Sequence, residues 1–288
     1  MYAPDFDYYR ATSVAEASAL LKKHPGAKLL AGGHSLIPLL KLRLAAPSAL
    51  IDIGRIDGLR GVSVTDGTVR IGALTTHAEL AASPELAKHC PALSEAAALI
   101  GDPAVRNRGT IGGNVAHADP ASDLPTVLAA LGARFVVAEG TATQSVAASD
   151  FFLGLMATAL GDYALVTAIE VPARSKGTGA AYVKFGHPAS RYAVIGVAAA
   201  VTVAGGACSA ASVVAGGLVP RPTRLSSVES AVVGQALTAD VIANAANRAG
   251  ADLGDDILGD IYASSEYRKA VAPVWVKRAL TAAAARVA

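Results

Sequence analysis

Two diglycine segments most constrain what this 288-residue chain can fold into. The first is Ala31-Gly32-Gly33-His34-Ser35, which follows a short apolar stretch over 28–31 and precedes a segment that favours a helix over 35–43. Glycine has no Cβ, so its backbone can adopt positive φ and approach a ligand closely. Free amide groups before a helix N-terminus form a site for phosphate oxygens. An ordinary glycine turn with Ser35 as the helix cap is the alternative interpretation.

The second diglycine segment is Thr110-Ile111-Gly112-Gly113-Asn114, within a glycine-rich loop predicted over 108–114. Its side chains add a hydroxyl and a carboxamide, and Asn114 offers both a hydrogen-bond donor and an acceptor. A β-turn is the alternative for this segment taken alone. Two such segments, each with a hydroxyl close by, together suit a long ligand with a pyrophosphate in its middle.

Neither segment matches the dinucleotide-binding motif of Rossmann folds, which requires G-x-G-x-x-G between a strand and a helix. Asp52 stands at about the distance from the first segment where that motif has its acidic residue, but the glycine spacing is wrong. The sequence therefore indicates a different kind of phosphate-binding fold.

The composition excludes several other classes of function. The formal net charge is +2 and no run of lysine and arginine occurs, so we expect no nucleic-acid surface. Cys90 and Cys208 are too few for an iron–sulfur cluster, which needs about four cysteines, and no CxxC motif indicates zinc. Four histidines that invite a metal interpretation lack the spacing of metal ligands: His34, His77, His117 and His187. We therefore expect no metal site in this chain.

The first residues have neither the basic region nor the apolar region of a signal peptide. No apolar stretch reaches the roughly 18 uninterrupted residues of a membrane span. We therefore expect a cytoplasmic protein without an integral membrane segment.

The pattern of apolar residues and turn signals predicts a mixed α+β fold without a regular βαβ alternation. The predicted helices cover 12–24, 35–43, 76–82, 85–90, 92–100, 122–131, 150–155, 238–249 and 265–287. The predicted strands cover 28–31, 49–53, a hairpin over 62–71, 133–138, 163–171, 181–185, 192–203 and 207–218. Small polar residues over 173–179 indicate a boundary between a first domain, 1–175, with subdomains of about 1–55 and 56–175, and a second domain, 176–288.

The two segments, AGGHS and TIGGN, in this order and at this separation, resemble those of the FAD-binding medium subunit of molybdenum hydroxylases. The carbon monoxide dehydrogenase medium chain is the nearest type, and the same module forms the middle domain of xanthine dehydrogenase. The resemblance covers essentially the whole chain. It includes Phe6-Asp7-Tyr8, the stretch over 46–53, the stretch over 71–76, and Asp102-Pro103 before the second segment.

This resemblance implies a fold and a set of cofactor-binding residues. The fold is the two-subdomain FAD-binding fold of the vanillyl-alcohol oxidase (PCMH) type, followed by a smaller C-terminal domain of a sheet and helices. Residues 31–35 and 110–114 are implied to cradle the pyrophosphate of FAD and neighbouring parts of the cofactor. Four further residues match family positions near the cofactor: Asp123, Val166, Lys184 and Tyr192.

Each of these four residues also has a purely structural interpretation. Asp123 lies in the first turn of a predicted helix, where any acid is favoured by the helix dipole. An isolated lysine such as Lys184 is usually solvated at a strand edge. Tyr192 and Val166 fit a protein core.

The resemblance also implies how such a chain works. We see no base, nucleophile or metal site that would oxidise a substrate, so no catalytic residue is predicted here. Oxidation is implied at the molybdenum cofactor of a large partner subunit, and electrons cross 2Fe-2S clusters of a small partner. FAD then passes them to an external acceptor, with Lys184 as a candidate for stabilising the reduced flavin. The implied assembly is a dimer of heterotrimers.

Two alternatives remain open at this stage. One is a self-sufficient FAD-dependent oxidoreductase that a small donor such as NADH reduces directly. The other is a scaffold subunit with a vestigial FAD site. The segment over 187–192 departs from true carbon monoxide dehydrogenases, which leaves aldehydes, purines and N-heteroaromatics open as substrates of the complex.

Overall fold

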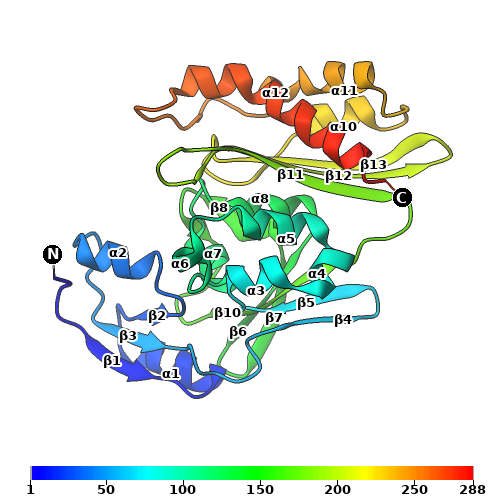
Figure 1. Ribbon diagram of the computed structural model, residues 1–288. Coiled ribbons are helices and arrows are strands. Elements are labelled where there is room, and N and C mark those ends of the chain that lie inside the picture. The colour runs from blue at the N-terminus through cyan, green and yellow to red at the C-terminus, as the bar shows by residue number, and fades with distance from the viewer. Residues whose placement is uncertain (1, 288) are drawn as a thin grey trace.

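The computed structural model describes residues 2–287 and has the α+β architecture that the sequence predicts. Three sheets of three or more strands follow one another along the described residues, as Figure 1 shows, and a two-stranded sheet accompanies the second. The first belongs to a small N-terminal lobe, the second to the central part of the molecule, and the third to the C-terminal domain.

The N-terminal lobe is a three-stranded parallel sheet with strand order β1-β3-β2 and two helices. Helix α1 begins after Ser13, whose hydroxyl accepts a hydrogen bond from the Glu16 amide at 3.1 Å and so satisfies one unpaired donor of the first turn. The elements of this lobe are β1 (Asp7–Arg10), α1 (Val14–Lys23), β2 (Lys28–Leu30), α2 (Leu36–Lys41) and β3 (Ala49–Asp52). All except β1 are predicted from the sequence.

The central sheet is antiparallel and has the strand order β4-β5-β10-β6-β7. The predicted hairpin is confirmed, because Asp66 and Gly67 have positive φ angles of 49° and 72° and join β4 to β5. A type I′ turn needs this geometry at both central residues. The strands are β4 (Val62–Thr65), β5 (Thr68–Gly72), β6 (Arg134–Glu139), β7 (Ala142–Ala147) and β10 (Leu165–Pro172).

Seven helices among the described residues accompany this sheet, and all of them except α6 contribute buried residues to its apolar core. They are α3 (His77–Ala82), α4 (Pro84–His89), α5 (Pro91–Ala98), α6 (Pro103–Arg106), α7 (Ile111–His117), α8 (Asp123–Ala130) and α9 (Ala148–Phe151).

Helix α7 corrects the loop predicted over 108–114. Ile111 and Val115 lie one helical turn apart and are fully buried, so the core stabilises a helix despite two glycines. The predicted helix over 150–155 is also only partly right. After α9 the chain extends into β8 (Phe152–Gly154), which pairs with β9 (Ala157–Thr158).

The C-terminal domain is an antiparallel sheet whose two faces are both covered. Helices α10, α11 and α12 lie over one face, and α8 and α5 pack against the other, as Figure 1 shows. Alternate residues of β11 therefore enter different cores: Ala181 joins the C-terminal core and Tyr182 joins the central one. The elements are β11 (Thr178–Gly186), β12 (Ala193–Ala204), β13 (Ala207–Gly216), β14 (Thr223–Arg224), α10 (Ser226–Val232), α11 (Ala239–Ala246) and α12 (Ser265–Ala284).

Candidate functional site

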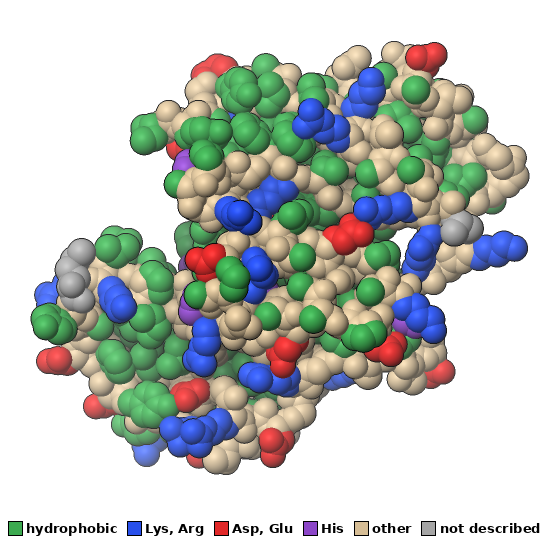
Figure 2. All heavy atoms as spheres, viewed as in Figure 1, with side chains coloured by type: hydrophobic (Ala, Val, Ile, Leu, Met, Phe, Trp, Pro, Cys, Tyr) green, Lys and Arg blue, Asp and Glu red, His purple; other side chains and the backbone are tan. Residues whose placement is uncertain are grey.

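The two diglycine segments, far apart in sequence, lie against each other in the structure. A Cβ added to Gly32 would lie 2.0 Å from the carbonyl oxygen of Arg108, just before the second segment. A Cβ added to Gly113 would lie 3.9 Å from the Cβ of Ala31. Gly32 therefore allows a backbone approach that a residue with a side chain would prevent, and Gly113 faces Ala31 at van der Waals distance. Figure 2 shows the surface hollowed between the N-terminal lobe and the C-terminal domain, on the side where Figure 1 places α2, α6 and α7.

The first segment presents unpaired backbone donors between β2 and α2. None of the amide groups of residues 32–35 donates a hydrogen bond to another residue within the described range 2–287. Gly33 has a φ of 76°, which a residue with a side chain rarely adopts. Ser35 makes no side-chain cap bond, so the interpretation of this segment as an ordinary capped turn loses its main support. A cluster of free amides is the arrangement that binds anionic oxygens.

The second segment differs, because most of its amides are already used. The Ile111 amide donates to the Thr75 carbonyl at 3.0 Å, and the Gly112 amide donates to the Ala73 carbonyl at 2.8 Å. The Gly113 amide donates to the Thr110 hydroxyl at 3.2 Å, which caps α7. The glycines of this segment thus provide close packing and a surface without side chains, rather than free donors.

Asn114 carries an unsatisfied acceptor at this position. Its Nδ2 donates to the hydroxyl of Ser122, while its Oδ1 is buried and accepts no hydrogen bond from the residues that the structure describes. A buried polar atom without a partner costs about 1–3 kcal/mol, so such an atom calls for an explanation. A donor from a bound ligand would satisfy it.

His77 packs against Gly109, which in turn contacts the first segment at Gly32. A Cβ on Gly109 would lie 2.7 Å from the His77 ring, so the imidazole packs directly under the backbone that contacts Gly32. Burial and, to a smaller extent, the charge of His34 together lower the pKa of His77 to about 4. His77 is therefore a neutral buried residue near neutral pH, in keeping with the structural role expected for it.

Asp123 and Lys184 form a buried ion pair between the central part and the C-terminal domain. The Lys184 ammonium donates to Asp123 Oδ2 at 2.8 Å and to the Leu99 carbonyl at 3.2 Å. Tyr182 donates its phenolic proton to Asp123 Oδ1 at 2.6 Å. Burial raises the pKa of the Asp123 carboxyl, and the charge and hydrogen bond of Lys184 oppose this shift, as does the bond from Tyr182. The Lys184 side chain is only 6% exposed, which excludes the solvated alternative.

Tyr192 and Val166 have different surroundings from each other. Tyr192 is 46% exposed, so it is not a core residue, and burial together with Asp119 and Asp123 raises the pKa of its phenol. It therefore lies near the same carboxylate as Lys184. Val166 is buried on β10 within the central core, so its structural interpretation fits and its contact with a ligand stays a prediction.

The structure thus brings the first segment, the start of α7, and Asp123 with Lys184 into one connected region. Tyr182 and Ser122 complete it, and neither was a candidate from the sequence. Tyr182 stands two residues before Lys184 on a predicted strand, so the period of two along a strand places both side chains on one face. That pattern is the signal that could have identified Tyr182.

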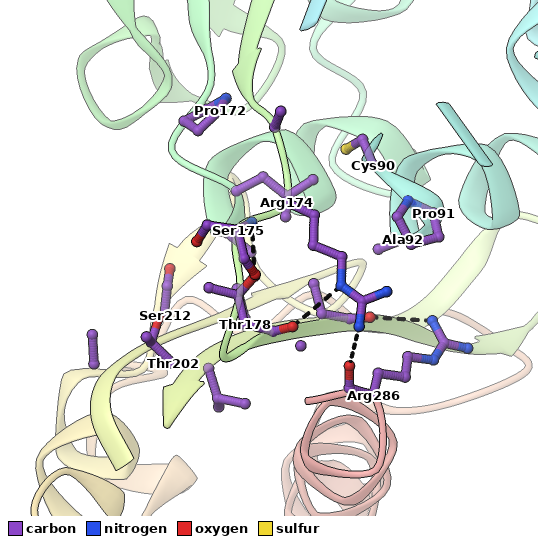
Figure 3. Close-up of a pocket in the computed structure, with 18 of the residues that line it drawn as sticks. Cys90, Pro91, Ala92, Pro172, Arg174, Ser175, Thr178, Thr202, Ser212 and Arg286 are labelled. Atoms are coloured by element: carbon purple, nitrogen blue, oxygen red, sulfur yellow. Dashed lines mark hydrogen bonds between the residues drawn. The ribbon is translucent and has the colours of Figure 1, made fainter. Parts of the chain in front are cut away.

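A separate cavity of about 370 Å³ lies between the central part and the C-terminal domain, along the linker that joins them. Figure 3 shows Arg174 and Arg286 meeting there from the linker and from the end of α12. Arg174 donates to the carbonyl oxygens of Thr178 and Arg286, and Arg286 donates to Glu95 and to the Ala180 carbonyl. None of the predicted cofactor-binding residues lines this cavity. Its arginines connect the two parts of the chain.

No group of three or more histidine, cysteine, aspartate or glutamate side chains within residues 2–287 is placed to hold a metal ion. Among the helices that the structure describes, none combines the length and the apolar character needed to cross a membrane.

Comparison with known proteins identifies relatives that extend over the whole chain. The family model described as "FAD binding domain in molybdopterin dehydrogenase" matches residues 4–174, and "CO dehydrogenase flavoprotein C-terminal domain" matches residues 180–283. The chain is 42% identical to the carbon monoxide dehydrogenase medium chain of Hydrogenophaga pseudoflava, covering 100% of both chains. It is 37% identical to the glyceraldehyde dehydrogenase medium chain of Sulfolobus acidocaldarius, covering 97% of this chain and 98% of the relative.

A solved structure agrees with these relationships. The fold superimposes with a TM-score of 0.96 on a chain of the carbon monoxide dehydrogenase from Hydrogenophaga pseudoflava that lacks the Mo-pyranopterin moiety of its molybdenum cofactor. The sequence identity is 42% and both chains are covered completely.

Proposed function

Because the chain belongs to the family of FAD-binding medium subunits of molybdenum hydroxylases, we propose that it holds FAD along the region built from its two diglycine segments and Asp123. It is the flavoprotein subunit of a molybdenum-dependent dehydrogenase of the carbon monoxide dehydrogenase and xanthine dehydrogenase type. Electrons pass from an iron–sulfur partner through the flavin to an external acceptor.

One observation carries the assignment of the site. Four consecutive amides, those of residues 32–35, are unpaired within the described structure, and Ala31 just before them lies against the exposed Gly113. Such a surface fits a diphosphate, whose oxygens are acceptors and whose charge is favoured at free amide groups. The buried Oδ1 of Asn114, which has no partner among the described residues, is a further acceptor at the start of α7 that a ligand donor would satisfy.

The chain's own residues then have distinct tasks. Residues 31–35 bind the diphosphate, and the exposed Gly113 lets the cofactor approach α7, while Gly112 is buried and lets α7 pack against Ala73. Lys184 offers one free donor, and Asp123 beside it offers further acceptor capacity. Tyr192 lies near the same carboxylate and is 46% exposed, so it is open to a ligand. Bound FAD supplies the electron-transfer chemistry, since flavins exchange electrons in single steps or in pairs.

The partners and the substrate follow from the same proposal. The relatives' names include both carbon monoxide and glyceraldehyde dehydrogenases, although each is a medium chain of nearly the same length. We propose that a large molybdenum-cofactor subunit selects the substrate, that a small subunit carries the 2Fe-2S clusters, and that the assembly is a dimer of heterotrimers. Carbon monoxide, aldehydes, purines and N-heteroaromatics are the substrate classes to test with the assembled complex.

Purification of the chain tests the cofactor assignment. We expect a yellow preparation from which denaturation releases FAD, at about one equivalent per chain. A colourless protein that takes up no added FAD would support a scaffold role and contradict the proposal. Rapid reduction of the bound flavin by NADH alone would instead support a self-sufficient oxidoreductase. Co-expression with the large and small subunits, followed by a mass measurement, tests the assembly.

A further inference from the structure

Both oxygens of the Asp123 carboxylate are held by residues of one strand in the C-terminal domain. Tyr182 and Lys184 stand two positions apart on β11, so their side chains leave the sheet on the same face. The Tyr182 phenol bonds to Oδ1 at 2.6 Å, and the Lys184 ammonium bonds to Oδ2 at 2.8 Å. Asp123 itself belongs to the first turn of α8, on the other side of the contact.

Gly196 on the neighbouring strand leaves room for the Tyr182 phenol at this position. A Cβ on Gly196 of β12 would lie 2.4 Å from the phenolic oxygen, so only glycine leaves room for it. Tyr182 is 6% exposed, and its single O–H donor is used on Asp123. A phenylalanine would fill the same apolar space, since Tyr182 packs within the central core. The hydroxyl group thus has one evident partner, the carboxylate.

The surroundings of Asp123 give the hydrogen bond from Tyr182 a part in keeping its carboxyl group ionised. Burial opposes the ionised carboxyl, and Tyr192 and Asp119 bring no positive charge that would favour it. Lys184 is the cation that contacts Asp123, and it also donates to the Leu99 carbonyl. An ammonium has three N–H donors, so one remains for a ligand. The position of that donor depends on whether Asp123 remains ionised and correctly oriented.

We propose that Tyr182 is a positioning residue of the flavin site: its phenol fixes the Asp123 carboxylate, which in turn holds the Lys184 ammonium toward the cofactor. Tyr182 itself does not touch the flavin. This inference rests on the proposed function, because Asp123 and Lys184 affect a flavin only where FAD lies beside them.

The test replaces Tyr182 with phenylalanine and follows the bound flavin as the pH changes. Loss of the phenolic hydrogen bond removes an interaction that favours the carboxylate, so Asp123 takes up a proton at higher pH than in the wild type. We expect the flavin absorbance spectrum and reduction potential of Tyr182→Phe to change through a one-proton step that lies at higher pH than in the wild type. Below that step, the affinity for FAD falls by about fivefold, as loss of one hydrogen bond predicts.

Two further variants make the test specific. Gly196→Ala keeps every polar group but displaces the phenol, and we expect it to shift the one-proton step in the same direction as Tyr182→Phe. Tyr8→Phe is the matched control, because Tyr8 also donates to a carboxylate, Asp52, at 2.6 Å, but in the N-terminal lobe. We expect it to leave the step unchanged.

The outcomes separate this inference from the proposed function. If the wild-type chain takes up no FAD, the proposed function fails, and the inference fails with it. If the wild type binds FAD but Tyr182→Phe and Gly196→Ala titrate like the wild type and Tyr8→Phe, the positioning role alone is refuted. Should Tyr182→Phe fail to fold, the comparison of Gly196→Ala with Tyr8→Phe decides the question.

Discussion

Replacing Gly113 with alanine should weaken FAD binding strongly while leaving the fold intact. Gly113 lies in the first turn of α7, where alanine is favoured over glycine by up to about 1 kcal/mol. The new Cβ would lie 2.9 Å from the Thr110 hydroxyl, a flexible cap whose loss costs about 1 kcal/mol. These two effects offset each other, so the free energy of unfolding of the apoprotein should change little.

The same Cβ would fill the space between the two diglycine segments, since it would lie 3.9 Å from Ala31. Forcing a ligand against an added methyl group costs about 1–3 kcal/mol. That energy corresponds to roughly 10- to 100-fold weaker binding. Fluorescence titration of the apoprotein with FAD measures the affinity, and urea unfolding measures the stability.

Gly32→Ala is the contrasting variant. Its Cβ would lie 2.0 Å from the Arg108 carbonyl oxygen, a backbone atom that cannot rotate away. We therefore expect it to destabilise the fold itself, by about 3 kcal/mol or more. The reasoning is refuted if Gly113→Ala binds FAD as tightly as the wild type, or if the two variants lose equal stability.

Three further predictions test the surroundings of the site. The pKa of His77 is about 4 in the folded chain and 6.5 in the unfolded chain, so the unfolded chain binds the extra proton between these pH values. The free energy of unfolding should therefore fall by up to about 3 kcal/mol as the pH drops from 6.5 to 4. Urea unfolding at several pH values should show that the stability of His77→Gln depends less on pH in that range. Lys184→Met leaves the Asp123 carboxylate buried without its cation, so it should cost about 3–5 kcal/mol in urea unfolding, and adding Asp123→Asn should recover part of that loss. Arg174→Gln removes exposed hydrogen bonds to the Thr178 and Arg286 carbonyls, so it should cost no more than about 1 kcal/mol and leave FAD affinity unchanged, as melting and titration would show.

The sequence correctly predicts those features of the fold that depend on residues close together in the chain. Ser13 caps α1 through the amide three positions later, and Asp66-Gly67 forms its hairpin turn through its own φ angles. Strand β7 is missed because Ala142–Ala147 is mostly exposed and polar, with no apolar alternation to detect. Its partner β6 stabilises it as an edge strand of the central sheet. Such tertiary pairing overrides a weak local preference.

The same distinction between local sequence and tertiary packing applies to the candidate site. Glycine pairs are visible in a sequence, but whether their amides are hydrogen-bonded is not. The amides of the first segment are unpaired, whereas those of Ile111 and Gly112 donate to the carbonyl groups of Thr75 and Ala73. That difference arises because α7 packs against a distant part of the chain. The bond between Asp123 and Tyr182 likewise joins residues from different domains, and no local pattern encodes it. The roles of residues 31–35 and 110–114 toward FAD remain predictions, as do those of Asp123, Val166, Lys184 and Tyr192.

A crystal structure of the chain loaded with FAD tests the central claim most directly. The account predicts that the diphosphate accepts hydrogen bonds from the amides of residues 32–35 and lies against Gly113, with Lys184 near the other end of the cofactor. A flavin bound elsewhere, for example in the cavity beside Arg174 that Figure 3 shows, would contradict it.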